Sequence, residues 1–191
     1  MKITKTSIAG LLILEPEIFR DDRGYFFESF NSDTFKTLGI EAEFVQDNES
    51  CSRKNVLRGL HFQVSPHAQG KLVRVVKGSV LDVAVDLRKD SPDFGKHVST
   101  FLSEENKAMF WIPPGFAHGF IALEEKTVFV YKCSETYHRE SERCIRWDDP
   151  ELNIDWGAEH PLVSEKDAKG ISFRDYAASL VNTSMNVGSN V

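Results

Sequence analysis

The amino-acid sequence predicts an all-β protein, built as a sandwich or barrel with only a few short helices. Short runs rich in β-branched and aromatic residues recur along most of the chain. Turn-forming clusters separate these runs, among them Ser91-Pro92 and Pro113-Pro114-Gly115. Many short strands joined by regular turns are typical of sandwiches and barrels, whereas βαβ units would alternate strands with helices.

The predicted strands are runs in which Val, Ile, Leu, Phe and Tyr dominate, because these residues favour a pleated, half-buried surface. They cover residues 11–14, 25–30, 44–46, 56–63, 72–76, 79–87, 97–102, 108–112, 119–123 and 127–132. The cluster Asp21-Asp22-Arg23-Gly24 predicts a turn before the second run. Gly78 predicts the turn that joins the run 72–76 to the run 79–87.

Two segments predict short helices. Ser32 can cap a helix through Leu38, and Gly39 follows at its end. Residues 173–180 predict the second helix, after a loop that packs back on the body of the protein. We therefore expect residues 1–180 to form a single domain. The remaining residues, 181–191, are mostly small and polar and predict a flexible C-terminal tail.

The run 79–87 alternates in character along its length. Leu81, Val83, Val85 and Leu87 share one face. The other face carries Val80, Asp82, Ala84 and Asp86. Two acids on one face of so apolar a strand indicate a polar cavity or its rim. The same alternation is also typical of a strand with one face in solvent, so the pattern leaves both readings open.

Length and composition indicate an ordinary globular protein. The chain has 191 residues, of which 41% are hydrophobic and 27% are charged, which fits one domain with a sizeable core. The net charge of −6 disfavours a nucleic-acid partner, because proteins that bind the phosphate backbone are normally basic. An anionic small molecule remains a candidate ligand, since local clusters of Arg and Lys decide its binding.

The sequence predicts a cytoplasmic protein without a membrane partner. No apolar run approaches the roughly 18 to 20 residues of a membrane span. The apolar residues 11–14 are followed at once by Glu15 and Pro16, which is unlike a signal-peptide cleavage site. Cys51, Cys133 and Cys144 are an odd number of cysteines without metal-type spacing, which favours reduced thiols.

The segment RGLHFQ at 58–63 carries the first candidate for chemistry, His61. A lone histidine in a strand is more often structural, but Arg58 is close in sequence and Lys71 follows a glycine-containing loop. Strict alternation places Arg58 and His61 on opposite faces of the strand. If both residues line one pocket, the strand must bulge or begin between them.

A second histidine, His118, follows the turn Pro113-Pro114-Gly115 and enters a strand. His61 and His118 raise the question of a metal. First-row metals in proteins usually require three or more ligands, often with a close histidine pair, and the chain contains no His-x-His. The ligand count therefore predicts no catalytic metal.

Three further residues have both a structural and a chemical interpretation. Tyr131 and Tyr137 can be packing aromatics with surface hydroxyls, or they can supply a proton donor and a stacking surface. Asp167 follows Ser164 at the spacing of a helix cap, so its default role is structural.

Six motifs in order carry a resemblance over nearly the whole chain, from Arg23 to about Trp156 and on to Asp167. They are DRGYFFE at 22–28, QDN at 46–48, RGLHFQ at 58–63, QGK at 69–71, PPGFAHGF at 113–120 and WDDP at 147–150. Together they resemble the dTDP-4-dehydrorhamnose 3,5-epimerase family, which has a cupin-type jelly-roll barrel. The Pro-x-Gly-x-x-His pattern is similar to a cupin motif without the His-x-His of metal cupins. This agrees with a family that works without metal.

The resemblance implies a role for each matching residue. His61 would be the general base, oriented by Asp167, with Tyr131 as the general acid and Lys71 stabilising the enolate. Tyr137 would stack on the thymine base. The other substrate-binding residues would be Arg23, Glu28, Gln46, Asn48, Arg58, His118, Glu142 and Lys166. The positions of Arg23 and Glu28 reach the neighbouring subunit's site in this family, so the resemblance implies a homodimer. It implies no cofactor.

The implied substrate is a 4-keto-6-deoxy sugar on dTDP. Its carbons 3 and 5 flank a ketone, so inversion requires a base on one face and an acid on the other. The resemblance implies inversion at both carbons, in dTDP-L-rhamnose biosynthesis. A related enzyme that inverts only C3 or only C5 would share nearly the same motifs. A sugar-binding jelly roll without catalysis is disfavoured, because it would not need the acid–base set of His61, Lys71, Tyr131 and Asp167.

Overall fold

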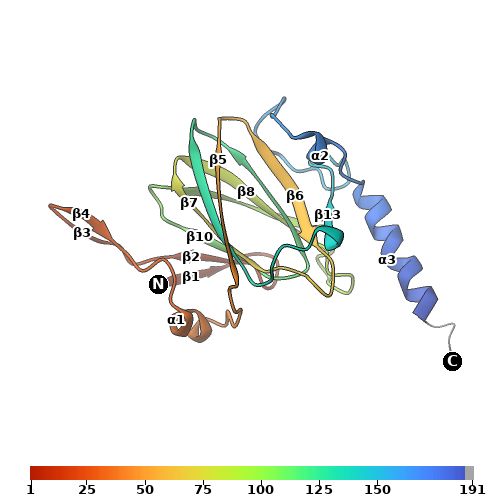
Figure 1. The fold of residues 1–191 in the computed structure, drawn as a ribbon, viewed down its shortest axis with the longest axis horizontal. Helices are drawn as coiled ribbons and strands as arrows, with labels where there is room; N and C mark the ends of the chain where they lie inside the picture. Colours follow the sequence, from red (N-terminus) through yellow and green to blue (C-terminus); the bar gives the residue numbers. More distant parts are fainter. Residues whose placement is uncertain (188–191) are drawn as a thin grey trace.

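Two antiparallel sheets face each other in a computed structural model that describes the backbone of residues 1–187 and the side chains of residues 1–181. The larger sheet has the order β1 (Lys2–Lys5), β2 (Leu12–Glu15), β10 (Met109–Ile112), β7 (Lys71–Lys77), β12 (Thr127–Cys133) and β5 (Gln46–Ser52). The smaller has the order β13 (Glu142–Cys144), β6 (Leu57–Gln63), β11 (Phe116–Ala122), β8 (Ser79–Asp86) and β9 (His97–Ser103). This arrangement confirms the predicted all-β jelly roll (Figure 1).

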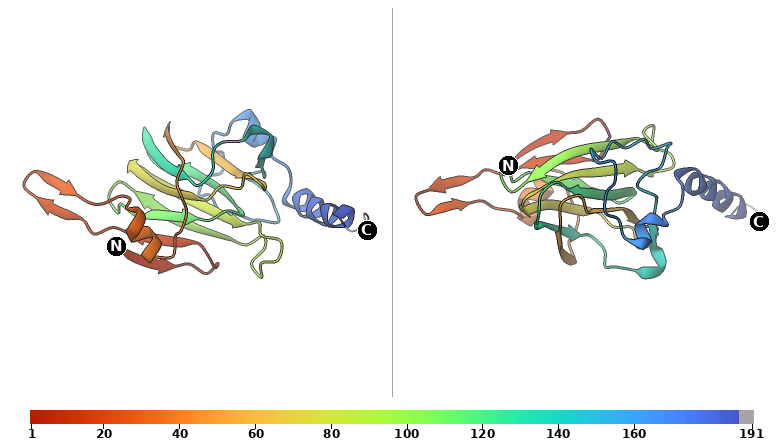
Figure 2. Two further views of the ribbon diagram at one scale, coloured as in Figure 1. Left: turned by 60° about the horizontal axis from the view of Figure 1, so that its bottom comes forward. Right: turned by 90° about the horizontal axis from the view of Figure 1, so that it is seen from above.

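Short elements extend from the barrel at opposite ends (Figure 2). The hairpin of β3 (Phe19–Asp21) and β4 (Gly24–Phe26) projects at one end. Helix α3 (Phe173–Val187) extends at the other, after the short α2 (Glu165–Ala168). A 3-10 turn, Arg139–Ser141, leads into β13, and α1 (Ser32–Thr37) lies near the N-terminus.

The apolar residues of the two sheets meet in a core between them. Val73 and Phe129 of the larger sheet pack with Val80 and Phe120 of the smaller one, and none is more than 4% exposed. The outer face of the smaller sheet is also buried, because the C-terminal segment covers it with residues such as Trp156. Both faces of β8 are therefore largely buried, which explains why apolar residues occur on both faces of the run 79–87.

The acidic face of β8 points inward. Asp82 and Asp86 are both fully buried, so the solvent interpretation of this strand is wrong. Neither acid lines the cavity itself; Asp82 reaches it only through His118, which does. Asp86 is neutralised locally by Arg88, whose Nη2 lies 2.6 Å from its Oδ2. Asp82 instead faces a histidine of the neighbouring strand β11.

A bulge in β6 resolves the conflict between Arg58 and His61. His61 pairs with His118 of β11, but Arg58 pairs with Phe120, so three steps along β6 match two along β11. The extra residue turns Arg58 and His61 to the same face, while Leu57 and Leu60 both join the outer apolar cluster. The bulge requires glycine at position 59, because φ is +138° there and an added Cβ would lie 2.5 Å from the Gly119 Cα.

Several boundaries differ from the prediction. The strand expected at 44–46 is β5, Gln46–Ser52, and its polar sequence QDNESCS hid it. Strands β1, β3 and β13 were not predicted, since each is short and has no fully buried residue. The cap of α1 is Asn31, not Ser32: its Oδ1 accepts from the N–H groups of Asp33 and Thr34.

The runs 72–76 and 79–87 are joined at Gly78 as predicted, but they do not pair with each other. They form β7 and β8, which belong to opposite sheets. The C-terminal helix continues to Val187, past the predicted end at 180 and into the segment predicted to be a flexible tail. Residues 188–191 of that tail lie outside the described part of the chain. Within residues 1–187, no helix has both the length and the apolar character that a bilayer span requires.

Candidate active site

A cavity of about 810 Å³ opens between the two sheets. Strands β5, β7 and β12 form one wall, β6, β11 and β13 form the other, and the loop before α2 closes one side. All but two of the thirteen residues predicted for the site line it: Gln46, Asn48, Arg58, His61, Lys71, His118, Tyr131, Tyr137, Glu142, Lys166 and Asp167. The fold therefore brings together residues that lie up to 121 positions apart in the chain.

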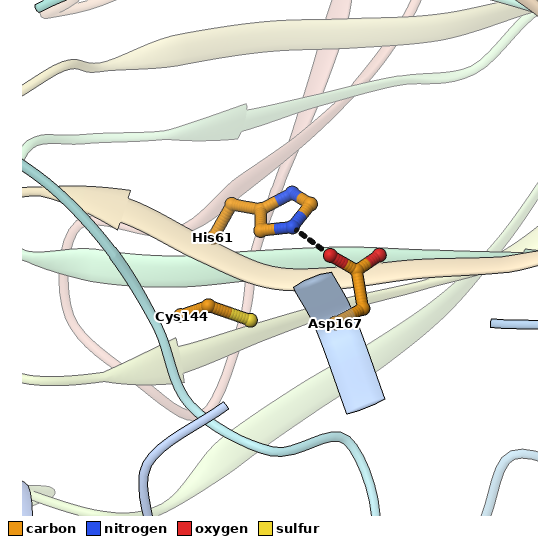
Figure 3. Close-up of side chains that lie close together, drawn as sticks. All are labelled: His61, Cys144 and Asp167. Carbon is orange, nitrogen blue, oxygen red and sulfur yellow. Dashed lines mark hydrogen bonds and ion pairs between the residues drawn. The ribbon is translucent and has the colours of Figure 1, made fainter. Parts of the chain in front are cut away.

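His61 and Asp167 form a hydrogen-bonded pair on one wall of the cavity (Figure 3). His61 Nε2 lies 2.7 Å from Asp167 Oδ1, and the Gly59 N–H donates to Asp167 Oδ2 at 3.3 Å. The Ser164 side chain caps α2 and accepts from the Asp167 N–H, which fixes the acid in place. The side chain of Asp167 therefore does not serve as a helix cap but is hydrogen-bonded to the predicted base, His61.

The electrostatics of the pair decide where the histidine proton lies. Burial acts to raise the pKa of Asp167, but the hydrogen bond and the charge of His61 outweigh it and hold that pKa below its ordinary value. An ionised carboxylate only accepts hydrogen bonds, so His61 Nε2 must carry the ring proton. The lone pair of the neutral imidazole is then on Nδ1, which points away from Asp167 in Figure 3. This is the tautomer that a general base requires.

A second histidine–carboxylate pair lies next to the first. His118 Nε2 lies 2.9 and 3.0 Å from the two carboxylate oxygens of Asp82, and both residues are buried. Burial raises the pKa of Asp82, and the attraction of His118 opposes that shift. His118 and His61 are register partners on adjacent strands, so their side chains share the cavity face.

Lys71 begins β7 on the opposite wall and is only 7% exposed. Burial lowers its pKa, and the nearby acidic groups Cys133 and Glu142 partly offset this shift. A buried ammonium group in a low-dielectric cavity is a strong stabiliser of negative charge that develops there.

Tyr131, on β12, also lies on the wall opposite His61. Burial raises the pKa of the Tyr131 phenol, so the hydroxyl keeps its proton at neutral pH. The cavity therefore places a proton acceptor on one side and a proton donor on the other.

The mouth of the cavity holds a polar network around Tyr137, which is 54% exposed. The Tyr137 hydroxyl donates to Glu142 Oε2 at 2.9 Å, and Lys166 Nζ lies 2.6 Å from Glu142 Oε1. Gln46 Oε1 accepts from the Tyr137 N–H, and the Gln46 amide donates to Asn48. These contacts hold an aromatic ring beside two amides and a lysine, a set suited to a nucleotide base and phosphate.

Arg58 is a positively charged residue of the cavity wall in addition to Lys166. Its Nε–H donates to the Ser52 hydroxyl at 3.2 Å. The guanidinium lines the cavity beside His61 because of the bulge at Gly59. Together, Arg58 and Lys166 give the otherwise acidic protein a local site for an anionic group.

The structure does not bring Arg23 and Glu28 to this cavity. Arg23 lies at the tip of the projecting hairpin and binds its own neighbour, with Nε 3.0 Å from Asp21 Oδ2. Glu28 accepts from the side-chain amide of Asn31 at 3.0 Å. Within one chain, neither residue takes part in the site.

Two polar residues of the cavity wall, Ser50 and Arg53, are among those that the sequence prediction did not include. Ser50 lines the cavity, and among the described residues its buried hydroxyl has no hydrogen-bond partner, so it is available to a ligand. Recognition of β5 as a strand would have found it, since Gln46, Asn48 and Ser50 alternate along one face. From sequence, Asp82 was only one of two acids on the same face of the run 79–87, without an assigned partner. Its partner, His118, lies on a strand that could not be placed from sequence.

One cluster in the described residues has the composition of a metal site. His61, Cys144 and Asp167 place one donor atom each within 4.8 Å of one another (Figure 3). Cys144 belongs to β13 and is the register partner of His61.

Comparison with known proteins identifies the family of the chain. The family model described as dTDP-4-dehydrorhamnose 3,5-epimerase matches residues 5–175. The dTDP-4-dehydrorhamnose 3,5-epimerase of Shigella flexneri is 54% identical over 176 residues, covering 92% of this chain and 97% of the relative. The relative from Mycobacterium tuberculosis is 39% identical over 184 residues, covering 94% and 91%.

Solved structures show the same likeness. A dTDP-6-deoxy-D-glucose-3,5-epimerase from Legionella pneumophila, in complex with dTDP-4-keto-L-rhamnose, has a TM-score of 0.90 and 51% identity, covering 94% of this chain and 96% of that one. ChmJ, a 3'-monoepimerase from Streptomyces bikiniensis in complex with dTDP-quinovose, has a TM-score of 0.84 and 30% identity, covering 94% and 90%. The chain is a carbohydrate epimerase and belongs to the dTDP-4-dehydrorhamnose 3,5-epimerase family.

Proposed function

We propose that this epimerase converts dTDP-4-dehydro-6-deoxy-D-glucose into dTDP-4-dehydro-L-rhamnose by inverting C3 and C5 in turn. The C4 ketone acidifies the C–H bonds on both neighbouring carbons. The observation that carries the proposal is the placement of His61 and Tyr131 on opposite walls of one cavity. Removal of a proton from one face and its return to the other inverts a carbon.

His61 is the proposed base, and Nδ1 is the atom that takes the proton. The resulting imidazolium is stabilised by the Asp167 carboxylate, which lies 2.7 Å from Nε2.

Lys71 and His118 are the proposed partners of the enolate that forms. Loss of the C–H proton places negative charge on the C4 oxygen, and Lys71 is buried on the cavity wall where such charge is poorly solvated. One donor of this kind is typically worth about 3 to 4 kcal/mol of transition-state stabilisation. His118 is held rigid by Asp82, so its orientation costs nothing at the moment of reaction.

Tyr131 is the proposed acid that returns a proton from the other side. Its raised pKa keeps the hydroxyl protonated before the reaction. The reaction moves only protons, so it requires neither a redox cofactor nor an electron sink.

The nucleotide is proposed to bind at the cavity mouth. Tyr137 offers a face for thymine, and Arg58 and Lys166 offer cations for the diphosphate. Glu142 holds both Tyr137 and Lys166, and Gln46 and Asn48 bind from the β5 edge.

A homodimer is proposed to complete each site. The hairpin exposes Phe19 by 57%, Tyr25 by 52% and Phe26 by 69%, an apolar surface typical of a protein interface. Arg23 and Glu28 lie on and just after this hairpin, away from their own cavity. In the dimer they bind substrate in the neighbouring subunit's site.

The dimer can be tested by mixing inactive variants. In a heterodimer, the Arg23→Ala subunit supplies an intact His61, and the His61→Ala subunit supplies an intact Arg23 to the same site. Each heterodimer therefore contains one complete site. Equal mixing with subunit exchange should restore about a quarter of wild-type activity, since half of the dimers are then heterodimers. Activity no higher than that of the separate variants would contradict shared sites.

Two variants test the proposed roles separately. His61→Ala should abolish exchange of substrate C–H with solvent, while calorimetry shows that dTDP still binds. Tyr131→Phe should retain exchange but lose completed inversion at one or both carbons. Full turnover in either variant would refute that residue's role.

The three thiols are unpaired, which supports the proposal that the enzyme works in the reducing cytoplasm.

A further inference from the structure

We propose that His61, Cys144 and Asp167 form a site for a thiophilic divalent cation such as Zn²⁺, and that an ion bound there inactivates the catalytic base. The inhibitory effect rests on the proposed role of His61. The cation site itself rests on the three side chains and is tested independently below.

The fold brings the three donors together from separate elements. Cys144 of β13 lies opposite His61 of β6, so both side chains are on the same side of the sheet. Asp167 approaches from α2 and bonds to His61 at 2.7 Å. All three donor atoms lie within 4.8 Å of one another, and Figure 3 shows the thiol and the carboxylate converging below the imidazole.

The donor types and the spacing fit zinc. Zinc sites commonly use three protein ligands from His, Cys and acidic residues and leave a fourth position open. Zn–N, Zn–O and Zn–S bonds of about 2.0, 2.1 and 2.3 Å place tetrahedral ligand atoms about 3.3 to 3.6 Å apart. The His61–Asp167 contact therefore has to open by under about 1 Å. His61 and Asp167 both line the cavity, so water from the cavity can supply the fourth ligand.

Without a metal, Cys144 is an ordinary thiol. Burial raises its pKa to about 12, and the charge of Asp167 adds to this effect. The S–H donates weakly to the carbonyl oxygens of Gly59 and Ile145, at 3.7 and 3.5 Å. A cation bound by the sulfur releases this proton to solvent, because only the thiolate is a ligand.

A metal on His61 Nε2 changes the tautomer of the ring. The proton now on Nε2 must leave that nitrogen, and a neutral imidazole then carries its single proton on Nδ1. The lone pair that the proposed mechanism uses is lost. Tyr137 and Arg58, at the nucleotide end, are not ligands, so the cation should lower kcat without weakening nucleotide binding.

The test compares wild type with Cys144→Ser, which removes the soft ligand and retains a small hydrogen-bond donor. Both proteins should have similar activity without added metal. Zn²⁺ should inhibit the wild type, and the concentration for half-inhibition should rise at least about tenfold in Cys144→Ser. Cys51→Ser is the matched control, because it removes an exposed thiol on β5, in the sheet opposite the one that carries His61, and should remain as sensitive as wild type. Zinc bound by the substrate diphosphate affects all three proteins equally.

Cd²⁺ gives a readout that does not depend on activity, since a cadmium–thiolate bond absorbs in the ultraviolet. The absorption should appear in Cys51→Ser and be lost in Cys144→Ser, and it should weaken in His61→Ala. Its absence from Cys51→Ser, or equal zinc sensitivity of Cys144→Ser and wild type, would overturn the site. Absorption with undiminished activity would support the site and count against His61 as the base.

Discussion

Replacement of Asp167 by asparagine is the sharpest perturbation of the proposed base. The Gly59 N–H donates to Asp167 Oδ2, so the asparagine amide should keep its oxygen at that position. Its NH₂ group then faces His61 Nε2 in place of the carboxylate oxygen. Nε2 has to accept a hydrogen bond, which forces the ring proton onto Nδ1. The variant should therefore hold a correctly placed histidine in the wrong tautomer.

The size of the effect follows from the burial of the pair. The same change in the Ser-His-Asp triad lowers kcat by about 10⁴-fold. Asp167 is almost as buried as in that case, at 5% side-chain exposure, but His61 is 31% exposed and water can stabilise part of its charge. We expect a loss of about 10³-fold in kcat for Asp167→Asn, equivalent to about 4 kcal/mol.

The assay is the rate of substrate C–H exchange with solvent deuterium, alongside the affinity for dTDP. Asp167→Asn should lose exchange and retain dTDP affinity. Glu165→Gln is the matched control, because it lies on the same helix with a side chain 96% exposed and should leave both quantities unchanged. Exchange in Asp167→Asn within threefold of wild type would refute the tautomer argument.

Three further changes test other parts of the structure. Lys71→Met should lower kcat by about 10² to 10³-fold yet raise the thermal midpoint at pH 7. Burial lowers the pKa of Lys71, so below that pKa the folded wild type carries a buried charge that destabilises it. The difference in thermal midpoint between variant and wild type should vanish above about pH 10.5, where Lys71 is neutral in both the folded and the unfolded state. An unchanged midpoint at pH 7 would contradict this. Gly59→Ala should lower the free energy of unfolding by about 2 kcal/mol or more in urea titration, because its Cβ would meet Gly119; a neutral change would refute the need for glycine. Tyr137→Ala should raise KM with little change in kcat, and a large kcat loss would contradict a role in nucleotide binding only.

Much of the barrel could be predicted from sequence because its strands are apolar on their buried faces. Runs such as 79–87 have the same composition whether they pair with near or distant strands, so their existence was predictable and their partners were not. Strand β5 escaped because its cavity face is polar, although that polarity is what makes it part of the site. A site lined by Gln46, Asn48 and Ser50 has no apolar period to detect.

The site residues were identified by motif resemblance, and their geometry required the three-dimensional structure. Strict alternation predicted Arg58 and His61 on opposite faces of the strand, because the sequence pattern does not reveal the bulge at Gly59. Asp167 and His61 are 106 positions apart, and no local pattern connects them. Cys144 had no assigned role in sequence because its proximity to His61 arises only from the pairing of β13 with β6.

The central claim is that one cavity deprotonates and reprotonates the sugar at both carbons beside the ketone. Incubation of the wild-type enzyme with dTDP-4-dehydro-6-deoxy-D-glucose in deuterated water tests it most directly. Mass spectrometry and NMR of the product should show deuterium at both C3 and C5, with both centres inverted. Deuterium at a single carbon would instead indicate a mono-epimerase. No deuterium, in a protein that still binds dTDP, would contradict catalysis by His61 and Tyr131.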